Sequence, residues 1–516
     1  MNSMPRSFYI QTVGCQMNVL DSELIAAELR RAGYVPADGV RRADVVLLNT
    51  CSVRAHAEDK IYSALGRLKN AKQYNPRKII GVLGCMAQKD RQLIFRRAPH
   101  VDLVVGPGRL HRLPELLARV ADGGGPCLEV SLDRAADDRA AVRQSFVPFT
   151  PRREIMGTGT SRDCRLAGAS HNGSEPVPII SRSAPHQAMV RIMSGCDKFC
   201  SYCVVPRVRG PEQSRPAAAI VDEVRRLADA GCLEVILLGQ TVNGYKDRTG
   251  QRTIALADLL AMLDRIEGLR RIKFVTNHPR HITKSLLEAV RDLPKVSPYL
   301  HVPAQSGSDA ILRRMKRGYG AATYREMLDR IRETVPNAAV TSDFIVGFCS
   351  ETEEDFRQTV ELVHDARFKN SFIFKYSPRP ETKAAELYAD DVPEAVKRRR
   401  NNELLAIQNA ISLEDNQPYF GRVVEILVEG PSKAARKQAA VITDGATAGS
   451  PHPGPLPKGE GTAQLVGRTV CDRIVVFDGP RELTGRIMPV RIDKVDAFTL
   501  FGSMPAASYT CRGNLR

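Results

Sequence analysis

Three apolar runs near the start of the chain are each followed by a cysteine. The pairs are residues 7–13 with Cys15, residues 44–49 with Cys51, and residues 78–83 with Cys85. Successive cysteines lie about 35 residues apart, the length of one strand, helix and return in a parallel sheet. Open α/β sheets bind ligands where parallel strands end. Residues 5–130 are therefore predicted to form such a sheet with converging cysteines, although buried strand-end thiols would fit the same spacing.

A second group of cysteines, Cys196, Cys200 and Cys203, has the spacing C-x3-C-x2-C. Three closely spaced thiolates can hold three irons of a cubic iron–sulfur cluster and leave the fourth iron open for chemistry. Structural zinc sites need four ligands in paired knuckles, and no second pair follows at finger spacing. The triplet thus predicts a 4Fe-4S cluster, with structural zinc and inert buried thiols as weaker alternatives.

The middle of the chain alternates strand-like and helical segments. The strand candidates are residues 188–193, 234–238, 272–276, 299–302, 340–346 and 372–376. Six β/α units favour a closed or partly closed parallel barrel, in which functional residues follow the strands. Polar or glycine-containing segments occur at these points, namely Gly195-Cys196, Gly239-Gln240, Asn277-His278-Pro279, Gln305-Ser306-Gly307 and Gly347.

The C-terminal part changes to short alternating strands at residues 421–428, 473–477 and 487–492. This pattern and its basic charge favour a small β-barrel of the kind that binds nucleic acid. The predicted fold class is α/β, with an open sheet domain, a partial (β/α)6 barrel and a small C-terminal β-barrel. The predicted boundaries are residues 5–130, a linker at 131–186, 187–416, 417–503 with a disordered insertion at 443–463, and a tail at 504–516.

The charge of the chain indicates a polyanionic partner. Its 75 Lys and Arg residues exceed its 58 Asp and Glu residues and give a formal net charge of +17. Nucleic acid is the leading candidate, and a basic surface kept for solubility is the alternative. Because there is no signal peptide and no apolar stretch long enough to span a bilayer, we expect a cytoplasmic protein without membrane contact. Cys164 in the linker is predicted to be an uncommitted surface thiol, and Cys127, Cys232, Cys471 and Cys511 are predicted to be structural bystanders.

The residues around the cysteines carry a family resemblance. They include Gly14-Cys-Gln-Met-Asn18, Asn49-Thr-Cys-Ser-Val-Arg54, Gly84-Cys-Met-Ala-Gln88, Gly195 to Pro206 with Arg209-Gly210, Gly239-Gln-Thr-Val-Asn243 and His301-Val-Pro-Ala-Gln-Ser-Gly-Ser308. In these motifs the chain resembles the radical S-adenosylmethionine (radical SAM) superfamily and, within it, the MiaB-type methylthiotransferases. The C-terminal segment is similar to the TRAM RNA-binding domain.

The resemblance implies an enzyme that places a methylthio group on carbon 2 of the prenylated adenosine beside the anticodon of tRNA. It implies two 4Fe-4S clusters, one bound by Cys196, Cys200 and Cys203 together with SAM, and an auxiliary one bound by Cys15, Cys51 and Cys85. By analogy Gly239 and Gln240 contact the SAM amine, and Gln305 and Ser306 lie near it; each of these four would equally suit a loop-shaping role. No further catalytic residue is assigned.

The implied partners are the tRNA, an electron donor such as a flavodoxin or ferredoxin, and a sulfur carrier, with the enzyme itself a monomer. Two rivals share both cysteine groups: a methylthiotransferase for a ribosomal protein and one for threonylcarbamoyl-adenosine in tRNA. Gln16-Met-Asn18 and Ser52-Val-Arg54 favour the prenylated-tRNA group, as does the positive charge. The alternative outside enzymes is an RNA-binding protein with a structural metal.

Overall fold

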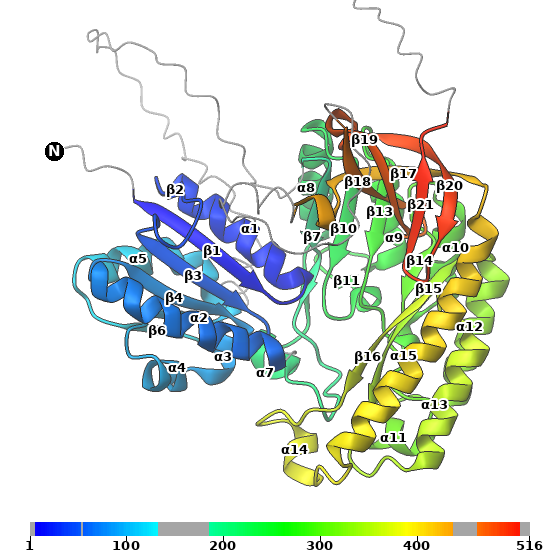
Figure 1. Ribbon diagram of the computed structural model, residues 1–516, viewed down its shortest axis with the longest axis horizontal. Helices are drawn as coiled ribbons and strands as arrows, with labels where there is room; N and C mark the ends of the chain where they lie inside the picture. The colour runs from blue at the N-terminus through cyan, green and yellow to red at the C-terminus, as the bar shows by residue number, and fades with distance from the viewer. Residues whose placement is uncertain (1–5, 53–54, 133–184, 437–461, 506–516) are drawn as a thin grey trace, which may run out of the picture. The chain divides into compact units, whose positions relative to one another are not determined.

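The computed structural model describes residues 6–52, 55–132, 185–436 and 462–505, without the side chains of residues 55–57. The chain divides into two compact units (Figure 1). One comprises Met1–Ser183 with Arg207–Gly210, and the other comprises Ala184–Pro206 with Pro211–Arg516. Most of the predicted linker and of the predicted insertion lies outside the described residues, as do Cys164 and Cys511. In the insertion, Thr462 and Ala463 are the exception, because they begin a strand and so correct the predicted end of the insertion at residue 463.

The described part of the first unit contains a parallel sheet of strand order β2-β1-β3-β4-β5-β6. The strands are β1 (Ser7–Val13), β2 (Val35–Pro36), β3 (Val45–Thr50), β4 (Ile79–Gly84), β5 (Leu103–Val105) and β6 (Cys127–Glu129). The helices are α1 (Gln16–Arg31), α2 (Ala55–Tyr74), α3 (Cys85–Asp90), α4 (Gln92–Arg97) and α5 (Leu113–Ala121). The order reverses between β1 and β3, and ligands bind at such a switch point in open α/β sheets.

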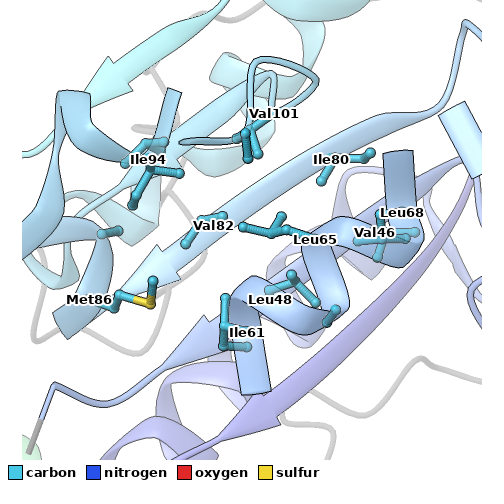
Figure 2. Packing of buried hydrophobic residues seen from close by; sticks show 14 of the residues in the cluster. Val46, Leu48, Ile61, Leu65, Leu68, Ile80, Val82, Met86, Ile94 and Val101 are labelled. Carbon is cyan, nitrogen blue, oxygen red and sulfur yellow. The ribbon is translucent and has the colours of Figure 1, made fainter. Parts of the chain in front are cut away.

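Both faces of this sheet are buried, which explains why its strands read as continuous apolar runs. Along β3, Val46 and Leu48 face a core that includes Ile61 and Leu65 of α2 (Figure 2). The alternate residues of β3 pack on the opposite face, where the second core contains residues of α1 and α5. Successive side chains of a strand point to opposite faces, so a single apolar strand supplies both cores.

The second unit contains the predicted β/α barrel. Its parallel strands are β7 (Gln187–Arg191), β10 (Glu234–Leu238), β13 (Arg271–Phe274), β14 (Tyr299–His301), β15 (Ala339–Val346) and β16 (Asn370–Lys375). They form two three-stranded sheets, β13-β10-β7 and β14-β15-β16. The amide of Asn277 donates to the carbonyl of His301 at 3.1 Å between the two sheets. The result is the expected partial barrel of six β/α units.

Helices connect these strands and cover them in Figure 1. They are α8 (Ala217–Asp229), α9 (Leu256–Asp264), α10 (Lys284–Asp292), α11 (Asp309–Arg314), α12 (Ala321–Thr334), α13 (Glu353–Ala366), α14 (Lys383–Leu387) and α15 (Glu394–Asn416). Two short elements flank the cysteine triplet, β8 (Met193–Ser194) and α7 (Val205–Arg209), and β8 pairs with β9 (Gln213–Ser214). No helix in the described ranges is both long and apolar enough to cross a membrane.

The C-terminal strands close into a barrel of order β17-β18-β19-β21-β20. They are β17 (Val423–Pro431), β18 (Thr462–Thr469), β19 (Ile474–Pro480), β20 (Ile487–Val495) and β21 (Thr499–Ser503). The sequence pattern identified three of them and missed β18 and β21. Each missed strand contains a glycine, Gly467 in β18 and Gly502 in β21, which interrupts the alternation of apolar side chains. Glycine is needed at both positions, because a Cβ there would lie 2.7 Å and 2.1 Å, respectively, from a backbone oxygen of the neighbouring strand.

A buried ionic network attaches this barrel to the beginnings of the β/α-barrel strands. Asp472, in the turn between β18 and β19, accepts from Lys273 of β13 at 2.9 Å and pairs with Arg468 at 2.9 Å. Lys273 also pairs with Glu234 at 3.0 Å. Active sites of β/α barrels lie at the carboxyl ends of the strands, and residues at the opposite end contribute to stability. The network therefore has a structural role.

Candidate functional sites

The structure brings Cys15, Cys51 and Cys85 to the carboxyl ends of three adjacent strands. Cys15 follows β1 and caps α1, Cys51 follows β3, and Cys85 follows β4 as the first residue of α3. Cys51 and Cys85 are buried, while Cys15 is half-buried. The thiol of Cys51 hydrogen-bonds to that of Cys15. The spacing in the sequence therefore predicted a real convergence at the switch point of the sheet.

Two asparagines and two glycines hold these strand ends together. Asn18 and Asn49 are fully buried, and the Asn18 Nδ2 donates to the Asn49 Oδ1 at 3.2 Å while the Asn49 Nδ2 donates to the Asn18 carbonyl at 2.9 Å. A Cβ on Gly14 would lie 2.7 Å from the Cβ of Cys51. Gly84 has φ +89° and ψ −156°, a conformation open almost only to glycine. Small residues therefore allow the cysteine-bearing ends to approach.

The surroundings shift the pKa values of two of these thiols in opposite directions. The hydrogen bond from Cys51 lowers the pKa of Cys15 to about 5, aided by Arg209 and by amides at the start of α1, against the effect of burial. Burial raises the pKa of Cys85, and Arg209 opposes this increase. Metal ligation needs thiolates, so Cys15 is prepared for it at neutral pH.

Arg209 is a functional candidate to which the sequence reasoning gave no role, although it lies in one of the motifs. Its guanidinium pairs with Asp21 at 2.8 Å, and the two side chains are only 3% and 0% exposed. It also faces the thiols of Cys15 and Cys85. Asp21 lies one and a half turns into α1, so that helix carries both a cysteine of the trio and the counter-ion of the arginine.

Cys196, Cys200 and Cys203 lie on the loop between β8 and α7 in the second unit. Thr241 approaches Cys196 with 3.6 Å between the hydroxyl oxygen and the sulfur. Burial raises the pKa of Cys196 and raises that of Cys203 to about 12, so binding of a positively charged cluster core must displace these protons. Arg317, which is 7% exposed, donates from Nη1 to the Cys200 sulfur at 3.2 Å.

Buried polar atoms without hydrogen-bond partners among the described residues mark the ends of β10 and β13. They are the Oε1 of Gln240, the Oδ1 of Asn277 and the Nε2 of His278. Burial, with Arg317 and His281 adding to it, lowers the pKa of His278 to about 3, so its ring is neutral at neutral pH. Unpaired buried polar atoms are costly, so this group of atoms is suited to binding a polar ligand.

The other predicted contacts have structural surroundings. A Cβ on Gly239 would lie 2.3 Å from Met193, and its carbonyl accepts from Thr276 at 2.7 Å. The Ser306 hydroxyl lies 3.2 Å from the Thr359 hydroxyl and accepts from the Ser308 amide at 3.2 Å. Gln305 is buried with φ +72° and bridges to β15 through its backbone. Their contact with SAM stays a prediction, and the loop-shaping alternative describes Gly239 and Ser306 well.

The comparisons with known proteins identify the family. Residues 7–106 match the family described as "Uncharacterized protein family UPF0004", and residues 190–363 match the radical SAM superfamily. The tRNA-2-methylthio-N(6)-dimethylallyladenosine synthase of Rhodopirellula baltica is 52% identical over 99% of this chain and 98% of its own length. The chain belongs to this synthase family. The synthase of an Acidovorax species is 42% identical over 98% of this chain and 99% of its own.

A solved structure supports the fold of this synthase. The radical S-adenosylmethionine methyltransferase TsrM of Kitasatospora setae is similar with a TM-score of 0.50 and 15% identity, covering 74% of this chain and 77% of that one. At that identity the likeness concerns the fold alone. Membership of the synthase family makes this chain an enzyme, so the alternative of a non-enzymatic RNA-binding protein is excluded.

The two cysteine trios of the synthase suit clusters better than single ions. In the described part of the chain, no three Cys, His, Asp or Glu side chains converge closely enough to hold one metal ion. A four-iron cluster holds its thiolates farther apart than a single ion does, because they bind different irons. The buried hydroxyls of Thr50 and Ser52, which flank Cys51, have no hydrogen-bond partner among the described residues. Such donors suit cluster sulfurs.

Proposed function

We propose that this synthase methylthiolates carbon 2 of N(6)-dimethylallyladenosine beside the anticodon of tRNA, using its two cysteine trios in different roles. Cys196, Cys200 and Cys203 hold the cluster that binds SAM, and Cys15, Cys51 and Cys85 hold the auxiliary cluster. The observation that carries this assignment is the presence of two separate trios at strand ends, each accompanied by a buried arginine. When bound, the clusters and SAM supply the electron, the radical and the sulfur of the reaction.

Residues at the ends of β10 and β13, in the unit that carries Cys196, Cys200 and Cys203, orient SAM. Gln240 and Asn277 each offer a buried oxygen that accepts from no donor in the described part of the chain, which suits the amine and hydroxyl groups of SAM. The backbone amide of Arg280 donates to the Nδ1 of His278 at 3.4 Å, so the neutral ring carries its hydrogen on Nε2 and is a donor. Two acceptors and a donor thus lie at the ends of β10 and β13, where β/α barrels bind their ligands.

The same trios require deprotonated thiols for loading. Cys15 meets this requirement at neutral pH, whereas the pKa of Cys203 near 12 means that loading of the second trio releases protons. Small residues such as Gly14 keep bulk away from Cys51. The chain thereby provides two cluster sites of different acidity on different units.

The wider context of the reaction belongs to the same proposal. The tRNA substrate is supported by the family name and by the net charge of +17, since cations on a protein bind phosphate groups. The C-terminal barrel is the RNA-binding part. We place the enzyme in the cytoplasm as a monomer, supplied by a low-potential electron donor such as a flavodoxin or ferredoxin and by a sulfur carrier.

Single cysteine substitutions test the division of roles. Cys51→Ala is expected to cleave SAM to 5′-deoxyadenosine and to form no 2-methylthio nucleoside, while Cys200→Ala does neither. SAM cleavage is measured by chromatography and the tRNA product by nucleoside mass spectrometry, after anaerobic reconstitution. The wild type should bind about eight irons, as two cubane clusters require.

Two buried cysteines outside the trios provide matched controls. Cys127→Ala in the first unit and Cys232→Ala in the second remove thiols that are 2% and 0% exposed, and both variants should retain product formation. Full product from Cys51→Ala would refute the auxiliary role. Methylthiolation of threonylcarbamoyl-adenosine in place of the prenylated base would favour the rival substrate.

A further inference from the structure

The two cysteine trios each have a buried arginine, and the two arginines differ in their counter-ions. Arg317 donates to a sulfur of the second trio, and Arg209 faces two sulfurs of the first. A buried cation is costly unless an anion compensates it. The identity of that anion is therefore informative at each site.

Arg317 has no carboxylate partner among the described residues. Its Nη1 donates to the Cys200 sulfur at 3.2 Å and to the Tyr202 hydroxyl at 3.4 Å, its Nη2 to the Pro303 carbonyl at 3.1 Å, and its Nε to the Tyr319 hydroxyl at 2.8 Å. Apart from the cysteine, these acceptors are neutral at physiological pH. The compensating charge for Arg317 must come from the Cys196, Cys200 and Cys203 site itself.

Arg209 has its own counter-ion. Asp21 lies 2.8 Å from its Nη2 within the same structural unit, and both side chains are almost completely buried. The pair therefore adds almost no net charge beside Cys15 and Cys85. The two trios thus differ in the compensation of their buried arginines, because Asp21 pairs with Arg209 whereas no carboxylate among the described residues pairs with Arg317. Glu212, which acts on Cys196, is itself paired with Lys198 at 3.9 Å.

We propose that this difference makes the cluster at Cys196, Cys200 and Cys203 easier to reduce, with Arg317 as its positioning and charge-compensating residue, while Asp21 cancels the same effect of Arg209 at the other trio. The inference rests on the proposed assignment of the two clusters. Reduction transfers one electron from a low-potential donor to a cluster and makes its charge more negative by one. An uncompensated cation beside it stabilises the reduced form, and net charge and hydrogen bonds to sulfur are known determinants of cluster potentials.

This difference has a consequence for the reaction. SAM cleavage needs an electron at the SAM-binding cluster, and an electron held by the auxiliary cluster would be withdrawn from it. An arginine compensated at one trio and uncompensated at the other directs the electron to the site where the radical forms. If the two arginines only supported the loops, replacing Arg317 or Asp21 would not change the cluster potentials in opposite directions. The electrostatic explanation predicts that loss of the Arg317 charge makes its cluster harder to reduce and that loss of the Asp21 charge makes the other cluster easier to reduce.

Potentiometric titration monitored by electron paramagnetic resonance tests the proposal in full-length protein. Each cluster is isolated spectroscopically by replacing the cysteines of the other trio with alanine. In the chain that retains Cys196, Cys200 and Cys203, Arg317→Gln should lower the ratio of reduced to oxidised cluster at a fixed potential at least tenfold, which is about 59 mV for a one-electron couple. Arg317→Lys keeps the charge and should stay within about threefold of the parent.

The chain that retains Cys15, Cys51 and Cys85 provides the opposite test. Asp21→Asn leaves Arg209 uncompensated and should raise the ratio of reduced to oxidised cluster at a fixed potential about tenfold, which is about 59 mV. Arg209→Gln leaves the carboxylate and should lower it, and the double variant should return toward the parent. The control is Arg225→Gln on α8, which removes the same charge from a side chain that is 58% exposed and should leave both potentials unchanged.

Iron content tests the proposed cluster assignments, and the potentials of the variants test the inference about the arginines. About four irons in each parent confirm the cluster assignments, and their absence would refute those assignments instead. Full iron content with potentials that do not respond to Arg317→Gln or Asp21→Asn would overturn the inference. If the Arg317→Gln variant loses its iron while the Arg317→Lys variant keeps its full iron content and its reduction potential, the requirement for a positive charge at this position is supported.

Discussion

At the residue scale, the positions that matter most beside the cysteines are ones without a side chain. Gly84 precedes Cys85 and has φ +89° and ψ −156°, and a Cβ there would lie 2.4 Å from the Asn49 Oδ1 and 2.9 Å from the Thr50 carbonyl. A methyl group at this position would strain the backbone and push apart the ends of β3 and β4. The glycine is thus part of the geometry that brings the thiols together.

Gly84→Ala is therefore expected to destabilise the protein by about 2 kcal/mol more than Gly123→Ala, because both positions have a positive φ but only the new methyl group at residue 84 overlaps its neighbours, and such overpacking costs about 1–3 kcal/mol. Gly123 is a matched control, since it has φ +85° but a Cβ there would meet nothing within 4 Å. Urea unfolding followed by circular dichroism measures the difference, and iron analysis should show loss at the first trio only. Equal effects of the two substitutions would mean that the steric overlap is relieved without cost.

The sequence predicted that Cys15, Cys51 and Cys85 meet at strand ends, but not the charges that surround them. Cysteine spacing is a local pattern, and the strand ends determine where such residues meet. Arg209 and Asp21 are separated by most of the first unit along the chain, and nothing local indicates that they pair. Arg317 lies in none of the motifs, because its role depends on a contact with Cys200, which is 117 residues away in the sequence. A buried arginine is recognisable only after folding has placed its partners.

At the element scale, the strands of the β/α barrel agree closely with the sequence pattern. Residues 234–238 were predicted as a strand and form β10. Buried parallel strands have a strong apolar signal, whereas strands of a small barrel are half exposed and tolerate glycine. This explains why β18 and β21 were missed while the larger barrel was predicted almost completely.

Asp472, in the turn between β18 and β19, is expected to make a measurable contribution to stability. Asp472→Asn should lower the free energy of unfolding by about 3 kcal/mol, because it removes one of the negative charges that compensate Lys273 and Arg468 in a buried network and leaves that network with an excess positive charge. Lys273, which pairs with Asp472, is 4% exposed. The exposed pair of Arg332 and Asp329 on α12 is the control, and Asp329→Asn should cost less than about 1 kcal/mol. Urea titration at pH 7 compares the two variants.

The lowered pKa of Asp472 predicts how its contribution to stability depends on pH. Burial raises the pKa of Asp472, but Lys273, Arg468 and Lys369 outweigh it, and the pKa lies below its usual value. A carboxyl with a depressed pKa stabilises the folded state above its unfolded pKa of about 3.9 and loses that contribution as the pH falls through the folded pKa. The difference between wild type and Asp472→Asn should therefore be constant from pH 5 to 7 and shrink below about pH 4. A difference that grows on acidification would contradict this sign.

At the scale of the whole molecule, the charge and the named relatives point to one class of substrate. The net charge of +17 favours a polyanion, and the relatives that the chain matches nearly from end to end are named for a tRNA nucleoside. The charge alone does not identify the binding surface. The C-terminal barrel offers a candidate, because Arg422, Arg491 and Lys494 are exposed on or beside strands β17 and β20.

Binding of tRNA should accordingly depend on salt, and part of that dependence should come from the barrel. Each cation that contacts a phosphate contributes about 0.9 to the slope of log K against log salt concentration for duplex nucleic acid. The triple variant Arg422→Gln, Arg491→Gln, Lys494→Gln should therefore lower the slope by about 2 to 3 and weaken binding about tenfold or more at low salt. Fluorescence anisotropy with labelled tRNA measures both quantities. The control, Arg225→Gln with Arg325→Gln and Arg332→Gln, removes three exposed cations from α8 and α12. If the control lowers the slope as much as the barrel variant, binding follows from overall charge and the barrel is not the RNA-binding surface.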